Sequence, residues 1–539
     1  MNKWKVLYSF VIKSLLVGLF VLGGSDLSAQ PESYDIIVRN GRIIDGAGNP
    51  WFRGDVAIRG DEIVRVGNIG EAVAKQNIDA AGKIVAPGFI DVHNHSRRQM
   101  FQVPNGENFI RQGVTTVVEG NDGSSPVPLA PFFERVNQTH LAVNFASFIG
   151  HGSVRQAVIG EEDRRATIEE MDRMKALVKE GMEQGALGLS SGLFYIPGAF
   201  ASTEEVVELS KIAGLYGGIY ISHMRDESAR LLNSVQETIE IGEKGGLPTQ
   251  ITHHKVIGAG NWGQSVETIQ LVEAARKRGV DVSIDQYPYT ASFTGSAALF
   301  PQWAQEGGHQ KLLERLKNPA TRRKIKAEVA QRIEVDRGGG DPQNVQLAFC
   351  EWDTTLNGKS LADVTRDRGR VSTFENAAET AIEIQQAGGC RAVYHAMNEQ
   401  DVKRIIQYPG TMIASDGGIL VFKEGVPHPR NYGTFPRVLG QYVREQGLLR
   451  LEDALRKMTS LPAQRIKLFD RGLLRPGMKA DISIFDEGKI IDRAEFGKPH
   501  QYAEGISHVL VNGVLVLNNG KMNPVRPGIV LYGPGRRVD

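Results

Sequence analysis

The sequence predicts an α/β fold in which a (β/α)8 barrel is joined to a composite β-sandwich. Two observations indicate the barrel: apolar, strand-like runs alternate with amphipathic helical segments through the middle of the chain, and eight such runs can be counted. A third observation indicates the β-sandwich. Short segments rich in Val and Ile, separated by glycine turns, occur near both ends of the chain. The two ends are therefore expected to form one β-rich unit.

The first 29 residues differ from the rest of the chain. Two lysines precede a mostly apolar run over residues 6–22, and small residues and "LSAQ" follow. This pattern is typical of a secretory signal peptide, and we expect cleavage after Ala29. Leu27 fits the −3 position of a cleavage site poorly, so an uncleaved anchor stays an alternative. We expect the protein to be exported, to the periplasm or outside the cell, and to be free of the membrane after cleavage.

The charge balance of the chain gives no indication of a strongly charged partner. Lys and Arg number 63 against 62 Asp and Glu, which gives a net charge of +1. This balance gives no support to nucleic-acid binding. The two cysteines, Cys350 and Cys390, can pair in an oxidising compartment or remain free thiols, and the sequence leaves both open. It does not indicate an oligomeric state.

Differences in the residue pattern divide the chain into regions. Residues 30–86, with "YDIIVRNGRIIDG" and "GDVAIRGDEIVRVG", form the first part of the predicted β-sandwich, and residues 471–539 form the second part. Residues 87–470 hold the barrel. Between its seventh and eighth strands, an insertion over about residues 291–390 includes the helical stretch "PATRRKIKAEVAQRIEVDRGG". An insertion of this size near the barrel mouth is expected to act as a lid.

The eight candidate strands end in polar residues. In order they are "GFIDVHNH", "VTTVVEGND", "NFASFIGHG", "ALGLSSGL", "GIYISHMRDE", "PTQITHHK", "DVSIDQYPY" and "GTMIASDGG". Parallel barrels carry their chemistry at the carboxyl ends of the strands. The polar ends of these runs are therefore expected to form the functional site.

Histidines follow three of these strands, and an aspartate follows a fourth. They are His93 and His95 after the first, His223 after the fifth, His253 and His254 after the sixth, and Asp416 after the eighth. A lone His-x-His is most often two surface histidines, but ligand-type residues from independent segments at one barrel end predict a metal site. Because neighbouring residues alternate across a strand, we expect His253 to be a ligand and His254 to be structural.

These motifs resemble the amidohydrolase superfamily and, within it, the N-acyl-D-amino-acid deacylases (D-aminoacylases). The resemblance covers almost everything after the first 29 residues and depends on "GFIDVHNHS", "GLSSGLFYIPGAFAS", "ISHMRDE", "ITHHK", "HPRNYGTFPRVLGQYVRE" and "MTSLPAQRIKLFDRGLLRPGMKADISIFD". It implies a TIM barrel with a β-sandwich, a lid-like insertion, and a zinc site. The activity that it implies is hydrolysis of the linear amide of small N-acyl-D-amino acids to a carboxylate and a D-amino acid.

One position departs from the family pattern. The family commonly has "GNCG" after the second strand, with the cysteine as a zinc ligand, whereas this chain has "EGNDG" with Asp122. A carboxylate can bind or bridge metals but is a harder ligand than a thiolate. We expect Asp122 to be a ligand, with one or two divalent ions and with manganese or cobalt as alternatives to zinc. The competing interpretation is that Asp122 caps a turn.

Two further observations limit the metal chemistry. Ser190 and Ser191 stand on the fourth strand, where many amidohydrolases have a carboxylated lysine, so a lysine-bridged centre is not expected. Glu119 is a nearby carboxylate for which a capping or ion-pair role is favoured.

Amide hydrolysis also needs a proton shuttle and substrate contacts. Asp416 is expected to take the proton of the attacking water and pass it to the leaving amine, as the resemblance also implies. Arg225 and Lys255 each follow a predicted ligand by two residues, and we expect them to bind the substrate carboxylate. Their alternative is an ion pair with Asp226 or Glu227.

Three more residues are candidates near the site. Tyr195 in "GLFYIPG" either reaches over the site or packs. His428 and Arg430 in "HPRNYG" are expected as lid or loop contacts.

Two other functions remain open at this point. The first is another amidohydrolase reaction, on dipeptides or cyclic amides. The second is a non-catalytic exported binding protein, against which the proton shuttle predicted for Asp416 argues.

Overall fold

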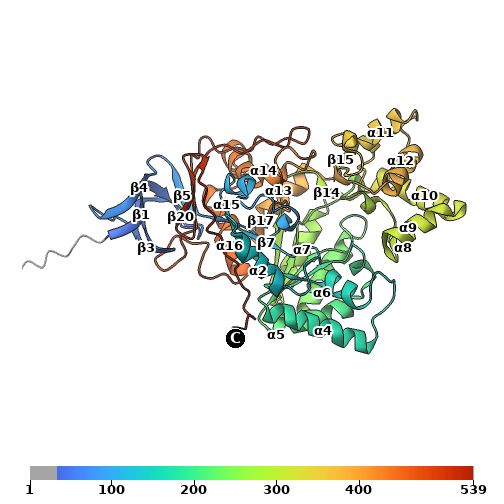
Figure 1. Ribbon diagram of the computed structural model, residues 1–539, viewed down its shortest axis with the longest axis horizontal. Coiled ribbons are helices and arrows are strands. Elements are labelled where there is room, and N and C mark those ends of the chain that lie inside the picture. The colour runs from blue at the N-terminus through green and yellow to red at the C-terminus, as the bar shows by residue number, and fades with distance from the viewer. Residues whose placement is uncertain (1–32, 538–539) are drawn as a thin grey trace, which may run out of the picture.

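The computed structural model describes residues 33–537 (Figure 1). The predicted signal peptide, residues 1–29, and residues 30–32 of the first predicted region lie outside the described residues. Among the described helices, none has the length and apolar character needed to cross a membrane.

Eight parallel strand segments form the barrel. They are β6 (Phe89–Asp91), β7 (Val114–Glu119), β8 with β9 (Asn144–Ser147 and Ile149–Gly150), β10 (Gly188–Gly192), β11 (Ile219–His223), β12 (Thr249–Ile251), β13 (Val282–Gln286) and β17 (Thr411–Ile413). Each pairs in parallel with its neighbour, and β8 and β9 are one run interrupted at Phe148. A parallel bridge between Asn94 and Gly417 joins the first strand to the last. The predicted (β/α)8 barrel is confirmed.

Helices follow the strands, and capping residues stabilise the ends of several of them. The longer ones around the barrel are α2 (Ala130–Thr139), α4 (Ile168–Glu183), α5 (Thr203–Leu215), α6 (Leu231–Gly245), α7 (Ser265–Lys277), α13 (Glu399–Gln407), α14 (Arg430–Arg437) and α15 (Leu451–Met458). Thr167 and Glu170 form a capping box that begins α4. Ser202 caps α5, and Gly246 ends α6 in the left-handed conformation. The start of α4, the start of α5 and the end of α6 are therefore each set by a residue that suits a helix terminus.

The two ends of the chain form one composite β-structure, as predicted. Its strands are β1 (Ser33–Ile43), β2 (Phe52–Arg59), β3 (Glu62–Gly67), β4 (Val73–Asp79) and β5 (Ile84–Pro87) from the N-terminal side, and β18 (Ile482–Phe485), β19 (Ile506–Val511), β20 (Val514–Asn518) and β21 (Lys521–Met522) from the C-terminal side. Antiparallel pairing of β5 with β18, with Val85 opposite Ile484, joins the two halves. The hydrogen-bonded order is β21-β20-β19-β18-β5-β1-β2-β3, with β4 paired to β1.

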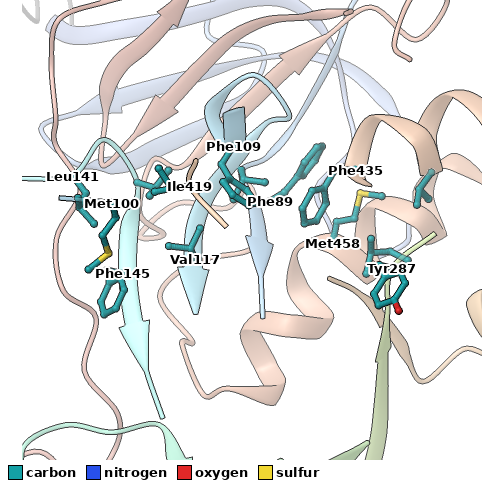
Figure 2. Close-up of a cluster of buried hydrophobic side chains, with 14 of the residues drawn as sticks. Phe89, Met100, Phe109, Val117, Leu141, Phe145, Tyr287, Ile419, Phe435 and Met458 are labelled. Atoms are coloured by element: carbon teal, nitrogen blue, oxygen red, sulfur yellow. The ribbon is translucent and has the colours of Figure 1, made fainter. Parts of the chain in front are cut away.

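A large apolar core connects this β-structure to the barrel. Phe89, Val117 and Phe145, from three neighbouring barrel strands, lie in one cluster with residues from distant segments (Figure 2). The ring of Phe89 stacks on that of Phe435 in α14, with centroids 5.7 Å apart. Burying apolar surface at this junction fixes the segment that leads into the first barrel strand and its two histidines.

The chain between β13 and β17 builds a separate layer. It contains β14 (Ser292–Gly295), β15 (Val345–Phe349) and β16 (Arg391–Tyr394) in an antiparallel sheet, with α8 (Gln302–Gln305), α9 (Gly308–Lys317), α10 (Pro319–Val335), α11 (Leu361–Asp367) and α12 (Phe374–Gln386). These elements have their own hydrophobic core and lie at the opposite end of the molecule from β1–β4 (Figure 1). Cys350 and Cys390 form a disulfide that joins the end of β15 to the start of β16. Of the two states that the sequence leaves open, the structure has the paired one.

Candidate active site

A cavity of about 270 Å³ opens at the carboxyl ends of the barrel strands. Barrel segments contribute polar side chains to its wall, namely His95, Asp122, His223, Glu227, His253, Lys255 and Asp416. The insertion between β13 and β17 contributes Phe293, Thr294, Arg337 and Arg391. The cavity therefore lies between the barrel and the insertion, where side chains from both can reach one bound molecule.

Two groups of ligand-type atoms meet at Asp122. The first consists of His93, His95, Asp122 and Asp416, and the second of Asp122, His223 and His253. Asp122 Oδ1 lies 3.4 Å from His93 Nε2 and 3.3 Å from His253 Nε2. Its other oxygen lies 3.5 Å from His95 Nε2 and 3.7 Å from His223 Nδ1. Asp122 thus occupies the position shared by two adjacent metal-ligand sets.

The donor atoms of this cluster fit a divalent metal. Both ring nitrogens of His93, both of His223, and Asp122 Oδ1 are buried without a hydrogen-bond partner among the described residues. Leaving buried polar atoms unpaired is costly, and such atoms in native proteins usually have a partner. Imidazole nitrogen and carboxylate oxygen are both established zinc ligands. Zinc at one or both positions would satisfy Asp122 Oδ1 and the ring nitrogen of each histidine that faces it, His93 Nε2 and His223 Nδ1.

The backbone is held in an unusual conformation at three of these residues. Asp122, His253 and Asp416 have φ angles of 54°, 34° and 51°, in the left-handed region that non-glycine residues rarely adopt. Such conformations persist where the surrounding structure fixes them, and they concentrate at functional sites. Gly418 shows the tight packing: a Cβ built there would lie 2.6 Å from the carbonyl oxygen of His95. Glycine at that position lets the first and last strand ends approach each other.

Asp416 is held by a cation behind the cavity. Its Oδ2 accepts a hydrogen bond of 2.8 Å from Arg430 Nη1, and its Oδ1 lies 3.1 Å from His95 Nε2. Burial raises the pKa of the Asp416 carboxyl, but Arg430 and the histidines lower it more, so the net pKa lies below the usual range. Arg430 is fully buried at the start of α14 and does not line the cavity. It orients Asp416 instead of forming the lid or loop contact that the sequence suggests.

Glu227 organises the other side of the cluster. Its Oε1 accepts a hydrogen bond of 2.5 Å from Lys255 Nζ and lies 3.2 Å from His253 Nδ1, while Oε2 lies 3.6 Å from His223 Nε2. Burial raises the pKa of Glu227, but Lys255 and the histidines lower it more, so that the net pKa falls below the usual range. The sequence indicates Glu227 only as an alternative ion-pair partner of Arg225 or Lys255. The signal that could have identified it is its position four residues after His223.

Arg225 is not placed as the sequence suggests. Its guanidinium pairs with Glu237 at 2.8 Å and donates to the carbonyl oxygens of Ala199 and Ala201. It does not line the cavity. The structure therefore does not support a substrate contact by Arg225, because its donors are already used in fixing the loop after β10. Lys255 does line the cavity and pairs with Glu227.

Other predicted residues separate into those inside and those outside the cavity. Tyr195 lines it, with its hydroxyl 3.1 Å from Thr294 Oγ1. His254 lies outside, with Nε2 2.8 Å from Thr268 Oγ1 on α7, and burial lowers its pKa to about 4. His428 is buried and contacts the carbonyl oxygen of Ala291.

The remaining polar candidates have local structural partners. Glu119 accepts a hydrogen bond from the backbone N–H of Arg97, which is a capping role. Ser190 donates to the Gly120 carbonyl oxygen, and Ser191 bonds to Tyr220.

The barrel and the histidine–carboxylate cluster define a metal-dependent (β/α)8-barrel enzyme. The chain belongs to the amidohydrolase family, whose model matches residues 76–291 and 355–517. The gap in this match falls within the insertion between β13 and β17.

Similar proteins are matched over almost their whole length. The chain is 36% identical to the D-aminoacylase of Alcaligenes xylosoxydans xylosoxydans over 94% of this chain and 99% of that protein. The crystal structure of N-acyl-D-glutamate deacylase from Bordetella bronchiseptica, complexed with zinc and a phosphonate mimic of the tetrahedral intermediate, matches with a TM-score of 0.80 and 32% identity. It covers 93% of this chain and 100% of that one. A D-aminoacylase structure that concerns the functional role of the binuclear metal centre of that enzyme matches with a TM-score of 0.79 and 35% identity over the same shares.

Proposed function

We propose that the protein is a zinc-dependent deacylase that hydrolyses the linear amide of N-acyl-D-amino acids to a carboxylate and a D-amino acid. The observation that carries this proposal is the pair of ligand sets sharing Asp122 in a cavity lined by cations. The full-length similarity to a D-aminoacylase and to an N-acyl-D-glutamate deacylase supports the substrate class.

The two ligand sets assign residues to metal binding. His223, His253 and Asp122 would hold one ion, and His93, His95, Asp122 and Asp416 would hold a second. A divalent ion supplies Lewis-acid polarisation of the scissile carbonyl and lowers the pKa of the attacking water. Asp122 offers a carboxylate oxygen where the family commonly has a cysteine sulfur. Manganese and cobalt are therefore the ions that compete with zinc.

Asp416 carries the proton. Its Oδ2 is held by Arg430, which leaves Oδ1 directed at the cluster. Oδ1 takes a proton from the attacking water and later gives it to the nitrogen of the leaving amine. The ion pair with Arg430 keeps the carboxylate in one orientation through both transfers.

Lys255 and Tyr195 orient the substrate. Lys255 Nζ has three donors, of which Glu227 engages one, so donors remain for the substrate α-carboxylate. Burial raises the pKa of Tyr195, so its hydroxyl stays protonated and can donate to the developing oxyanion. The insertion closes over this site as a lid and excludes bulk water.

The competing reactions are less well supported. A cyclic-amide hydrolase of the lysine-bridged type needs a lysine on the fourth strand, where β10 carries Ser190 and Ser191 instead. A binding protein needs no oriented proton carrier such as Asp416. Removal of metal with a chelator should abolish hydrolysis of N-acetyl-D-amino acids, and added zinc should restore it. Hydrolysis that survives chelation, or unchanged ligand binding with no hydrolysis, would contradict the proposal.

We also propose that the protein is exported. The leader-like sequence before "LSAQ" and the disulfide between Cys350 and Cys390 support this location. The mass of secreted protein should correspond to a chain that starts at or near residue 30. A soluble cytoplasmic product that retains Met1 would contradict export.

A further inference from the structure

Arg391 is a cation in the cavity that has no counter-charge. It is the first residue of β16, directly after the disulfide-bonded Cys390, and its side chain lines the cavity. Within residues 33–537, no carboxylate forms an ion pair with it. β16 pairs with both β14 and β15, so the backbone of Arg391 is held on both sides. The side chain therefore extends toward the cavity from a fixed backbone position.

The other buried cations around the cavity already form ion pairs with carboxylates. Lys255 and Arg337 both pair with Glu227, at 2.5 and 3.6 Å, and Arg430 pairs with Asp416. Arg97 at the rim donates to the carbonyl and hydroxyl oxygens of Ser124. Arg391 is different because its charge is left for a ligand.

The position of Arg391 relative to the metal cluster can be read from Phe293. The Arg391 guanidinium lies 4.5 Å from the Phe293 ring centroid, and that of Arg430 lies 5.7 Å from the same centroid. Arg430 contacts Asp416 directly, whereas Arg391 forms no ion pair with Asp416 or Asp122. Arg391 therefore lies in the same cavity but outside the immediate contacts of the cluster.

The charge of Arg391 persists at neutral pH. Burial, together with Arg98 and Arg430, lowers its pKa to about 10, which leaves the guanidinium protonated at pH 7. A partly buried charge without a partner is unfavourable, and a carboxylate would relieve this by a charge-assisted, bidentate contact.

We propose that Arg391 binds a second carboxylate of the substrate, carried by the D-amino-acid side chain, and that it makes the enzyme selective for N-acyl-D-amino acids with acidic side chains. This inference rests on the proposed function. The α-carboxylate is attached to the carbon bonded to the scissile nitrogen, so it must stay beside the cluster, where Lys255 lies. A side-chain carboxylate extends further, toward Arg391. An acidic acyl group offers the same chemistry and is the alternative source.

Matched substrates and variants separate these cases. N-acetyl-D-glutamate and N-acetyl-D-glutamine differ in side-chain charge at nearly equal size, and N-succinyl-D-glutamine moves the charge to the acyl group. Arg391→Gln removes the cation and Arg391→Lys retains it. Arg323→Gln, on the exposed surface of α10, is the matched control. Melting curves for each variant establish that it folds.

Wild-type protein should hydrolyse N-acetyl-D-glutamate with a kcat/KM at least about 10-fold above that for N-acetyl-D-glutamine. Arg391→Gln should lower kcat/KM for the glutamate substrate by about 10- to 100-fold and change the glutamine substrate little. Arg391→Lys should retain part of the preference, and Arg323→Gln should keep all of it. An equal loss on both substrates would overturn the inference, because Arg391 would then bind the α-carboxylate.

Two other outcomes would also overturn the inference. They are a wild-type enzyme with no preference for glutamate, and a loss in Arg391→Gln that is confined to the succinyl substrate. Wild-type protein that hydrolyses none of the substrates would contradict the proposed function instead. Calorimetric binding of N-acetyl-D-glutamate would then still test Arg391, and equal affinity in wild type and Arg391→Gln would reject its role.

Discussion

Asp416 and Arg430 form a buried ion pair in which Nη1 lies 2.8 Å from Oδ2. This contact gives the two carboxylate oxygens different roles. One oxygen is fixed by the guanidinium, and the other lies beside His95 at the metal cluster. The pair links the end of the eighth strand to the first turn of α14. It explains why a buried arginine that does not line the cavity matters for the site.

Asp416→Asn should lower kcat without unfolding the protein. The amide keeps the size of the side chain and one oxygen, but it cannot accept a proton from water. General acid–base catalysis contributes about 10²- to 10⁴-fold, and we expect a loss in this range. Asp492→Asn, which alters an acid paired with Arg437 away from the cavity, is the control. Near-normal turnover in Asp416→Asn would show that another group is the base.

The three histidines at the carboxyl ends of strands β11 and β12 should differ in their effect on bound metal. His223→Ala and His253→Ala each remove a side chain of the cluster, so both should lose zinc and activity. His254→Ala should retain most of the zinc because its ring faces Thr268 on α7. Elemental analysis of the purified variants measures this. Equal metal loss in all three would mean that the ligand on β12 is wrongly assigned.

Glu227→Gln should weaken metal binding although Glu227 belongs to neither ligand set. Its carboxylate contacts both His223 and His253 on the side away from Asp122. Loss of such an orienting partner typically lowers metal affinity or activity about 10- to 100-fold. Glu237→Gln breaks a comparable ion pair with Arg225 outside the cavity and should leave zinc affinity unchanged. Chelator titrations of both variants compare them, and equal affinities would refute the orienting role.

The fold could be predicted largely from local patterns. Strand-like runs ending in polar residues located all eight barrel strands, because buried parallel strands are apolar and their chemistry collects at one end. The segment around His93 shows the limit of this reasoning. Both of its histidines lie after β6, which ends at Asp91. The alternation of side chains along a strand therefore does not determine their direction. The residue between them, Asn94, forms a bridge with Gly417 after the last barrel strand.

The rest of the site depends on contacts that no local pattern contains. The role of Glu227 depends on how β11 and β12 are paired, and Arg337 and Arg391 come from an insertion whose position over the barrel is set by tertiary packing. The position of Arg225 differs from the expectation for the same reason. Its spacing after His223 matches that of Lys255 after His253, but Glu237 on α6 draws its guanidinium away from the cavity.

Asp122 should control how many metal ions the protein holds. Its two oxygens lie near histidines of both ligand sets, so Asp122→Ala should reduce metal stoichiometry and turnover. Asp122→Cys introduces a softer ligand and should tighten zinc relative to manganese and cobalt. Metal analysis with competition between these ions measures both effects. Normal stoichiometry in Asp122→Ala would show that the residue only caps the turn between Gly120 and Gly123.

If a metal cluster centred on Asp122 hydrolyses N-acyl-D-amino acids, the protein should release one enantiomer from a racemate. Zinc-loaded protein would be incubated with racemic N-acetyl-amino acids, including N-acetyl-glutamate and N-acetyl-methionine, and the free amino acids separated by chiral chromatography. We expect release of D-amino acids alone, and no release after chelation of the metal. Release of the L-enantiomer, or no free amino acid from any member of the set, would contradict it.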